Sequence, residues 1–132
     1  MIGLDTNVLV RYIMQDDREQ AAQASRVIEA LTIDEPGLIT LVALVELVWV
    51  LDACYQLDRS QQADVLERLL RTRELLIERA AVVWQAQRAF VSGKGDFADC
   101  LIERCAAAAG CSRTVTFDRN AARHANMVPL HR

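Results

Sequence analysis

Short apolar segments alternate with longer helix-like segments along this chain, and no other feature constrains the fold as strongly. The short segments have the length and composition of strands and cover residues 1–5, 37–40, 74–78, 113–117 and 127–130. Apolar residues between them recur at helical spacing, which predicts helices over residues 6–14, 18–32, 41–55, 60–72, 80–91, 96–109 and 120–125. Strands that alternate with helices predict an α/β fold with a largely parallel sheet.

Residues at the ends of these segments predict where several helices begin and stop. Thr6 or Asn7 is expected to cap the first helix, and Ser60 the helix that runs to about Thr72. Gly110 follows an alanine-rich helix at the position where a left-handed residue commonly ends one. The first strand, residues 1–5, is expected to be buried.

Length and composition favour one ordinary globular domain. The chain has 132 residues, 52% of them apolar and 25% charged, which predicts a single domain over residues 1–132. No apolar run is long enough to cross a membrane and no basic leader precedes the first strand, so a cytoplasmic protein is expected. The net charge of −3 gives no sign of broad nucleic-acid affinity. Four cysteines without C-x-x-C spacing and only two histidines argue against zinc.

Acidic residues stand where a folded chain normally avoids charge. Asp5 ends the first strand, and Asp118 ends the β-branched stretch 113–117. Glu46 is alone inside the apolar run 41–51, which predicts that it is buried. Buried carboxylates are costly unless a positive group meets them, and the carboxyl ends of parallel strands are where ligands bind in open α/β sheets. Together with Asp96 and Asp99, which share a helix face, these residues predict one acidic, cation-binding pocket.

Each of these acids also has a purely structural interpretation. Asp5 and Asp118 precede helices and are good N-cap residues, and Asp96 with Asp99 is close to a capping box. Glu46 could form a salt bridge with an arginine. Glu103, one turn after Asp99, is expected to be solvated, and Asp16 and Asp17 are expected to lie in a solvated link. These alternatives remain open from the sequence alone.

Converging carboxylates suit hard divalent cations. Mg²⁺ and Mn²⁺ prefer oxygen ligands and keep several waters, so three or four carboxylates hold them without filling every coordination position. The open positions accept a phosphate oxygen and a water that the metal acidifies. Small polar side chains beside the acids are suited to positioning the phosphate: Thr6, Asn7, Thr116 and Asn120.

Four blocks of sequence, in order, resemble the PIN-domain ribonucleases, and specifically the VapC-type toxins of bacterial toxin–antitoxin pairs. They are IGLDTNVLVRYI near the N-terminus, VELVWVL in the middle, then GDFADCLIERCAAAAGC and TVTFDRNAARH. The resemblance covers essentially the whole chain. By motif position, the family's four acidic residues match Asp5, Glu46, Asp99 and Asp118, and a frequent fifth acid matches Asp96.

The resemblance implies a three-layer α/β/α sandwich with a mainly parallel central sheet and an acidic pocket that binds Mg²⁺ or Mn²⁺. It implies an endoribonuclease, a homodimer, and a cognate antitoxin protein whose tail covers the active site. Lys94 and Arg119 are further candidates for substrate contact, although no motif assigns them. The alternative function is a catalytically inactive module of the same fold that binds RNA or protein. A phosphoacceptor receiver domain is rejected, because it needs paired acids after the first strand and a lysine late in the chain.

Overall fold

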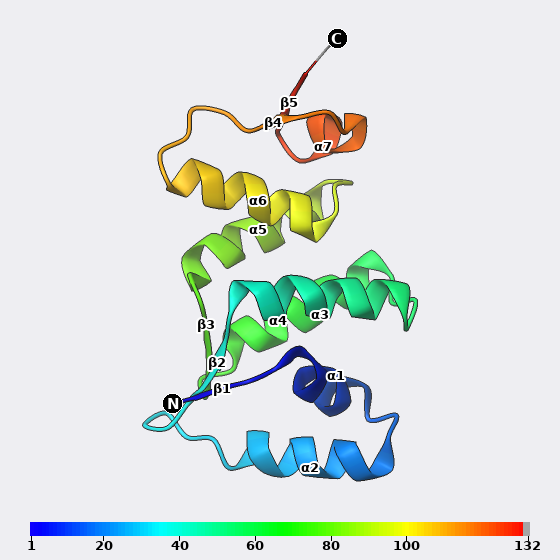
Figure 1. The fold of residues 1–132 in the computed structure, drawn as a ribbon, viewed down its shortest axis with the longest axis vertical. Helices are drawn as coiled ribbons and strands as arrows, with labels where there is room; N and C mark the ends of the chain where they lie inside the picture. The colour runs from blue at the N-terminus through cyan, green and yellow to red at the C-terminus, as the bar shows by residue number, and fades with distance from the viewer. Residues whose placement is uncertain (131–132) are drawn as a thin grey trace. The chain divides into compact units, whose positions relative to one another are not determined.

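The computed structural model describes residues 1–130, in which strands and helices alternate as the sequence predicts (Figure 1). The elements are β1 Ile2–Gly3, α1 Thr6–Met14, α2 Arg18–Glu29, β2 Gly37–Ile39, α3 Leu41–Ala53, α4 Arg59–Arg71, β3 Leu75–Ile77, α5 Ala80–Ser92, α6 Phe97–Ala108, β4 Val115–Thr116, α7 Arg119–His124 and β5 Val128–Pro129. Every predicted strand and helix is present, and the structure shortens most of them.

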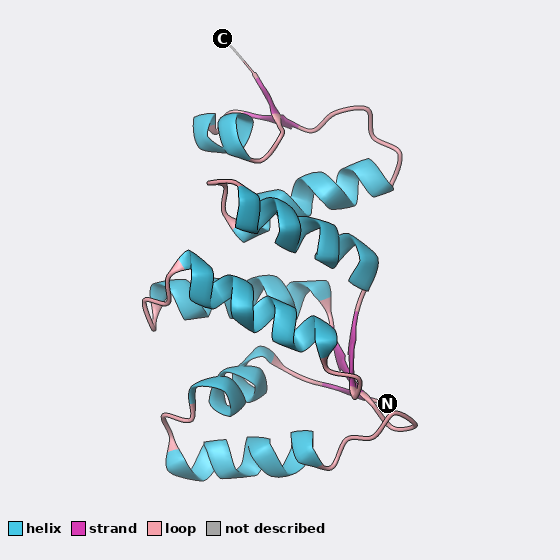
Figure 2. Cartoon of the chain, turned by 180° about the vertical axis from the view of Figure 1, so that it is seen from behind, coloured by secondary structure: helices cyan, strands magenta, loops and turns pink. Residues whose placement is uncertain are grey.

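The strands pair in parallel, as predicted, and the described ones form two sheets (Figure 2). The first sheet has the order β1-β2-β3, with Gly37 opposite both Ile2 and Leu75. In the second, β4 pairs with β5. The chain therefore has a helix-rich α/β fold with a three-stranded parallel sheet, consistent with the expected α/β/α architecture.

The chain divides into two compact units, Met1–Glu78 and Arg79–Arg132. In the first unit, α1 contacts α2 and α3, while α4 packs on α3 and β3. Fully buried leucine and isoleucine side chains fill the space between these elements: Leu9, Ile39, Leu44, Leu47, Leu51 and Leu66. In the second unit, α5 packs on α6, and the buried rings of Phe90 and Phe97 meet edge to face with centroids 6.0 Å apart. That arrangement suits the quadrupoles of two aromatic rings.

The N-cap residues differ from those expected at two helices. The cap of α1 is Asp5, not Thr6 or Asn7, because Asp5 is the last residue with extended backbone, at φ −75° and ψ 156°. The cap of α4 is Asp58 rather than Ser60, since Asp58 and Gln61 form a reciprocal capping box. Both helices therefore begin with an aspartate carboxylate that accepts a hydrogen bond from a backbone N–H.

Two glycines in the second unit have definite geometric roles. Gly110 has φ +99°, and its N–H and that of Cys111 donate to Ala107 and Ala106, which confirms the predicted helix stop as a Schellman motif. Gly95 lies directly before Asp96, and a Cβ there would lie 3.0 Å from the carbonyl oxygen of His124. Because backbone blocks that space, only glycine lets the start of α6 approach the end of α7 so closely.

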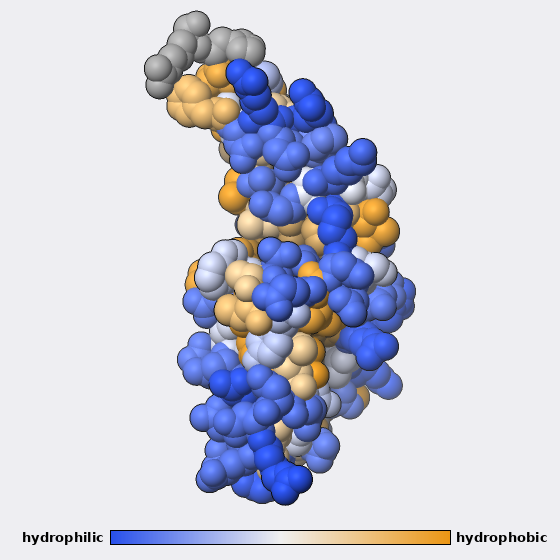
Figure 3. All heavy atoms as spheres, turned by 90° about the vertical axis from the view of Figure 1, so that its right-hand side faces the viewer, coloured by the Kyte–Doolittle hydropathy of each residue, from blue (hydrophilic) through white to orange (hydrophobic). Residues whose placement is uncertain are grey.

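The expectation of a buried first strand is wrong. The side chain of Ile2 is 47% exposed, and the buried residue is Leu4, which follows the strand. The reason is that β1 has a partner on only one side in the sheet of described strands. On the face that Figure 3 shows, hydrophilic residues predominate, with hydrophobic residues between them. Among the described residues, no helix has both the length and the apolar character needed to span a bilayer.

Candidate active site

The first unit contains a cavity of about 560 Å³ that is lined by Asp5, Thr6, Asn7 and Glu46, and we call it the α1–α3 cavity. The Asp5 carboxylate lies at the N-terminus of α1 and accepts a hydrogen bond of 2.7 Å from the N–H of Thr6. Thr6 is buried, and its hydroxyl donates to the carbonyl oxygen of Ala43 at 3.5 Å, which links α1 to α3. This contact holds two acids that are far apart in sequence against one hollow.

Glu46 is exposed, so the prediction that it is buried is wrong. It lies on a face of α3 that also carries Val42 and Trp49, which are 79% and 64% exposed. The apolar sequence around Glu46 therefore does not mean burial, because this face of the helix is uncovered although its residues are hydrophobic. No ion pair of Glu46 occurs among the described residues. Its carboxylate is accordingly open to a ligand.

A network of polar side chains that the sequence did not predict contributes Arg11, Asp16 and Tyr55 to the lining of the α1–α3 cavity. The Arg11 guanidinium donates from Nη1 to Asp16 at 3.1 Å and to the Tyr55 hydroxyl at 3.3 Å, and from Nε to Gln20 at 2.7 Å. Tyr55 in turn donates to Asp16 at 2.6 Å. We call these four residues the Arg11 network. Asp16 lies exposed in the link between α1 and α2, as expected, and it also lines the cavity and accepts hydrogen bonds from Arg11 and Tyr55.

The network shifts the pKa values of its members in the directions that stabilise it. The Tyr55 hydrogen bond, followed by the hydrogen bond and charge of Arg11, outweighs desolvation and lowers the pKa of Asp16. The pKa of Tyr55 is raised, chiefly by its hydrogen bond to Asp16. Arg11 loses some solvation, which lowers its pKa, but Asp16 and Tyr55 more than compensate and the pKa is raised. At neutral pH the network therefore contains a carboxylate and a guanidinium.

In the second unit, Asp96, Asp99 and Asp118 form an acidic group that we call the Asp99 cluster. Asp96 caps α6 by accepting from the N–H of Asp99 at 2.8 Å. Asp118 caps α7 by accepting from the N–H groups of Asn120 and Ala121 at 2.8 and 3.3 Å. The capping interpretations of Asp5, Asp96 and Asp118 are thus confirmed. In each of them Oδ1 accepts the capping hydrogen bonds, so Oδ2 can still bind a ligand.

Repulsion within the Asp99 cluster is visible at Asp99. Burial raises the pKa of Asp99, and so do the negative charges of Asp96 and Asp118 and a hydrogen bond with the Asp96 side chain. Like charges held together without a counter-charge disfavour ionisation in this way. A carboxyl group whose pKa is raised in the folded protein destabilises the fold once it ionises, unless a cation compensates its charge.

Two predicted positioning residues adjoin the Asp99 cluster. The Thr116 hydroxyl accepts a hydrogen bond of 3.0 Å from the N–H of Asp118, and Asn120 donates its N–H to the Asp118 carboxylate. Thr6 and Asn7 line the α1–α3 cavity, where the Thr6 hydroxyl already has a backbone partner. Lys94 and Arg119 are exposed, in the loop before α6 and at the first position of α7.

Glu103 is buried rather than solvated. Its carboxylate accepts two hydrogen bonds from Arg104, at 2.7 and 2.8 Å, and lies 3.5 Å from the side-chain nitrogen of Asn126. The bidentate pair compensates for burial of the charge, and it raises the pKa of Arg104. Glu103 therefore belongs to the packing of α6 and not to the Asp99 cluster.

The donor chemistry of the predicted site suits Mg²⁺ or Mn²⁺, since carboxylate oxygens supply all five acids. Within residues 1–130, however, no group of three or more His, Cys, Asp or Glu side chains has an arrangement that would hold a metal ion. The chemical fit thus rests on the type of donor and on the repulsion at Asp99.

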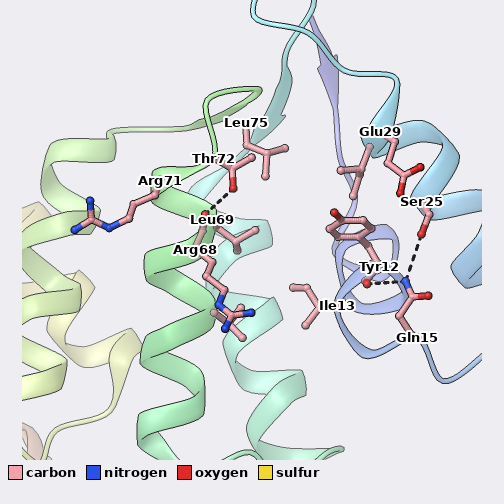
Figure 4. Close-up of a pocket in the computed structure, with 12 residues that line it drawn as sticks. Tyr12, Ile13, Gln15, Ser25, Glu29, Arg68, Leu69, Arg71, Thr72 and Leu75 are labelled. Atoms are coloured by element: carbon pink, nitrogen blue, oxygen red, sulfur yellow. Dashed lines mark hydrogen bonds between the residues drawn. The ribbon is translucent and has the colours of Figure 1, made fainter.

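A larger cavity of the first unit, about 740 Å³, carries none of the predicted acids (Figure 4). Tyr12 and Ile13 of α1 and Gln15, its C-cap, line one side of it, while Arg68, Leu69 and Thr72 lie on the other side, along α4 and its end. Gln15 bridges α1 and α2 by donating to Ser25 at 3.3 Å. This cavity is larger than the α1–α3 cavity, but its lining contains no pair of carboxylates that could hold a divalent cation.

The charge on Asp99 should make the protein less stable as pH rises. Below the ordinary carboxyl pKa of 3.8, Asp99 is protonated in the folded and the unfolded chain. As pH rises from there through the raised folded pKa, the unfolded chain ionises first and the free energy of unfolding falls. Asp99→Asn should therefore raise the melting temperature by a few degrees at neutral pH in chelator, and the gain should disappear near pH 3.8. Calorimetry across this range, with the exposed Asp64→Asn as a control, measures it; an equal gain at every pH would exclude the electrostatic cause.

No curated protein matches the chain. The family model described as PIN domain matches residues 2–127, which include both acid-bearing regions. With a match over nearly its whole length, together with the α/β fold and parallel strands, the chain belongs to the PIN domain family.

Proposed function

We propose that this protein is a metal-dependent endoribonuclease that hydrolyses RNA phosphodiester bonds, with Asp5, Glu46, Asp99 and Asp118 as its catalytic carboxylates. PIN domains are generally metal-dependent nucleases, and the observation that carries the proposal is the family match over residues 2–127. All four acids lie within that match. The same match spans both compact units, which supports the view that residues 1–132 act as one nuclease domain.

The proposed cofactor is Mg²⁺ or Mn²⁺, held by oxygens of Asp5, Glu46, Asp99 and Asp118 and by the additional acid Asp96. Such an ion, when bound, acidifies a water and neutralises charge on a phosphate. Support comes from the repulsion that raises the pKa of Asp99, since a protein that retains this cost gains from a cation at that place. The capping hydrogen bonds of Asp5, Asp96 and Asp118 fix each carboxylate on a helix end while leaving oxygen lone pairs free.

Small polar groups are proposed to position the scissile phosphate. Asn7 lines the α1–α3 cavity beside Asp5, and Thr6 does so next to it. Thr116 and Asn120 flank Asp118 and hold it through hydrogen bonds. A carboxylate that is held rigidly in this way loses little freedom when a ligand binds, which favours catalysis over mere binding.

The alternative is an inactive module of the same fold that binds RNA or protein. The Asp99 cluster speaks against it, because a surface that only binds RNA gains nothing from three mutually repelling carboxylates, which also repel phosphates. In a metal-dependent nuclease the same carboxylates would bind the divalent cation, which would compensate their charges. The nuclease therefore accounts for the electrostatics of the cluster and the inactive module does not.

We further propose that the ribonuclease is a VapC-type toxin. In that role it works in the cytoplasm as a homodimer and is silenced by a cognate antitoxin protein. Support comes from the order of the four sequence blocks that resemble these toxins. The exposed apolar side chains Val42 and Trp49 on α3 would suit contact with another chain.

Incubation of the purified protein with total RNA tests the function. Cleavage is expected with Mg²⁺ or Mn²⁺ and not in chelator, and it should leave 5′-phosphate and 3′-hydroxyl ends because water attacks phosphorus. Ends with a 2′,3′-cyclic phosphate would mean that the substrate's own 2′-hydroxyl is the nucleophile. Binding of RNA without any cleavage under all metal conditions would favour the inactive module instead.

A further inference from the structure

Arg11 is the one cationic residue among those that line the α1–α3 cavity. The cavity's other charged residues, Asp5, Asp16 and Glu46, are all acidic. Only one of them, Asp16, forms an ion pair with Arg11. A cavity with this balance repels a phosphate unless Arg11 faces it, so the orientation of Arg11 decides whether a polyanion can enter.

The Arg11 network fixes that orientation. Nε and Nη1 of the guanidinium are occupied by Gln20, Asp16 and Tyr55, from three different parts of the unit. The structure shows no hydrogen bond from Nη2 within residues 1–130. The Arg11 side chain is 32% exposed, so the guanidinium is partly buried yet accessible. Because the guanidinium is already immobilised, the Arg11 side chain loses little conformational entropy when a ligand binds to Nη2.

A purely structural role explains less of this arrangement. A partly exposed ion pair such as Arg11–Asp16 adds little to the stability of a fold, because water screens the two charges. An ion pair alone would stabilise the fold without hydrogen bonds from both Nε and Nη1 of Arg11. It would also not need to lie at a cavity that is lined by Asp5 and Glu46. A held guanidinium with one open edge is, in contrast, the usual recognition group for phosphate oxygens.

We infer that Arg11 is a substrate-binding residue that contacts a backbone phosphate of single-stranded RNA in the α1–α3 cavity, while Asp16, Gln20 and Tyr55 position it. This inference rests on the proposed ribonuclease function for the choice of RNA as the ligand. It adds a cationic contact to a site that is otherwise described by its acids alone.

The test measures binding and not cleavage. The probe is a fluorescein-labelled oligouridylate in chelator, and the protein carries Glu46→Gln, which removes one cavity charge. Anisotropy over a range of salt concentrations gives both the Kd and the slope of log Kd against log salt. Arg11→Ala should weaken binding about tenfold or more at low salt, as loss of a charged hydrogen bond does. It should reduce the magnitude of the slope by about 0.7, the value for one phosphate contact on a single strand.

Conservative variants separate contact from positioning. Tyr55→Phe keeps the charge of Arg11 and removes the hydroxyl that holds it, so the Kd should rise while the slope stays unchanged. Arg11→Lys should also keep the slope but lose affinity, since an ammonium cannot retain the fork of hydrogen bonds. Arg26→Ala, an exposed arginine of α2 outside the cavity, should alter neither quantity. These variants keep the test decisive even if Arg11→Ala unfolds.

The outcomes distinguish this inference from the proposed function. If the unmodified chain cleaves RNA while Arg11→Ala binds the probe with unchanged Kd and slope, the ribonuclease stands and the role of Arg11 is excluded. If Arg11→Ala reduces the slope by about 0.7 but the unmodified chain never cleaves RNA, Arg11 is a phosphate contact in a binding protein and the proposed ribonuclease function is wrong. If Tyr55→Phe reduced the salt dependence of the Kd although the charge of Arg11 is kept, the phosphate contact could not be assigned to Arg11 and the inference would be wrong.

Discussion

Replacement of Glu46 by glutamine should lower the rate of the proposed RNA cleavage by a factor on the order of 10³, because a carboxylate in the proposed metal-binding role contributes several kcal/mol to transition-state stabilisation. Glu46 is exposed on α3 and forms no ion pair among the described residues, so the change should leave the melting temperature almost unaltered. Steady-state cleavage of a labelled RNA in Mg²⁺ measures the effect. Glu29→Gln, an exposed glutamate of α2, is the matched control and should retain full activity.

Asp5 and Asp118 are also N-cap residues, so their role in cleavage is best tested by replacement with asparagine rather than alanine. Asp5 and Asp118 cap α1 and α7, and loss of a cap costs about 1 kcal/mol in its own right. Asparagine caps a helix about as well as aspartate but carries no charge. Asp5→Asn and Asp118→Asn should therefore abolish cleavage and keep the fold. Asp17→Asn and Asp58→Asn make the same change at the caps of α2 and α4 and should cleave normally.

These variants also decide which acids the proposed chemistry needs. If Asp5→Asn and Glu46→Gln cleaved RNA while Asp99→Asn did not, catalysis would depend on the Asp99 cluster alone. If all of them cleaved at the normal rate, the acidic assignment would be wrong, whatever the family of the fold. Circular dichroism and melting curves on each variant show whether a loss of cleavage comes from loss of structure.

Local sequence signals predicted the secondary structure well. Helical spacing located all seven described helices, and Gly110 marked the end of α6 with the left-handed backbone that a glycine permits. Predictions of burial from local context were weaker. Glu46 was expected to be buried because its neighbours are apolar, yet Val42 and Trp49 on the same face are exposed as well. Hydrophobicity sets what a face prefers, while only the packing of other elements determines whether it is covered.

The Arg11 network shows what a single sequence hides about a site. Its hydrogen bonds join Arg11 to Tyr55, 44 positions away, and Tyr55 to Asp16, 39 positions away. No local spacing encodes such contacts, since they depend on how α1 lies against the end of α3. The one available signal was an arginine inside the otherwise apolar stretch VLVRYIM of α1. The burial of Glu103 was missed for a different reason: its partner Arg104 is adjacent in sequence, and the pairing rule for helices applies to residues three or four apart.

Removal of one arginine from the tail of the proposed antitoxin should release the proposed ribonuclease activity while leaving most of the affinity of the complex. The Asp99 cluster repels itself, so a guanidinium that reached it would relieve the repulsion that raises the pKa of Asp99. The geometry exists within this chain, where Arg104 meets the Glu103 carboxylate with two hydrogen bonds of 2.7 and 2.8 Å. An antitoxin arginine with the same fork would occupy the carboxylate oxygens that the cofactor needs and would block phosphate entry at once.

The expected result is a large change in activity with a small change in binding. Exposed charge pairs contribute roughly 0.2–1 kcal/mol, so Arg→Ala in the tail should weaken the complex about two- to fivefold, while apolar contacts supply the rest of the affinity. RNA cleavage by the stoichiometric complex should rise toward that of the free protein. The measurements are cleavage in Mg²⁺ and titration calorimetry on the same preparation, with an arginine of the antitoxin outside the tail replaced as the control. If the tail variant bound normally and still inhibited fully, steric cover alone would explain the inhibition and the acidic cluster would have no part in it.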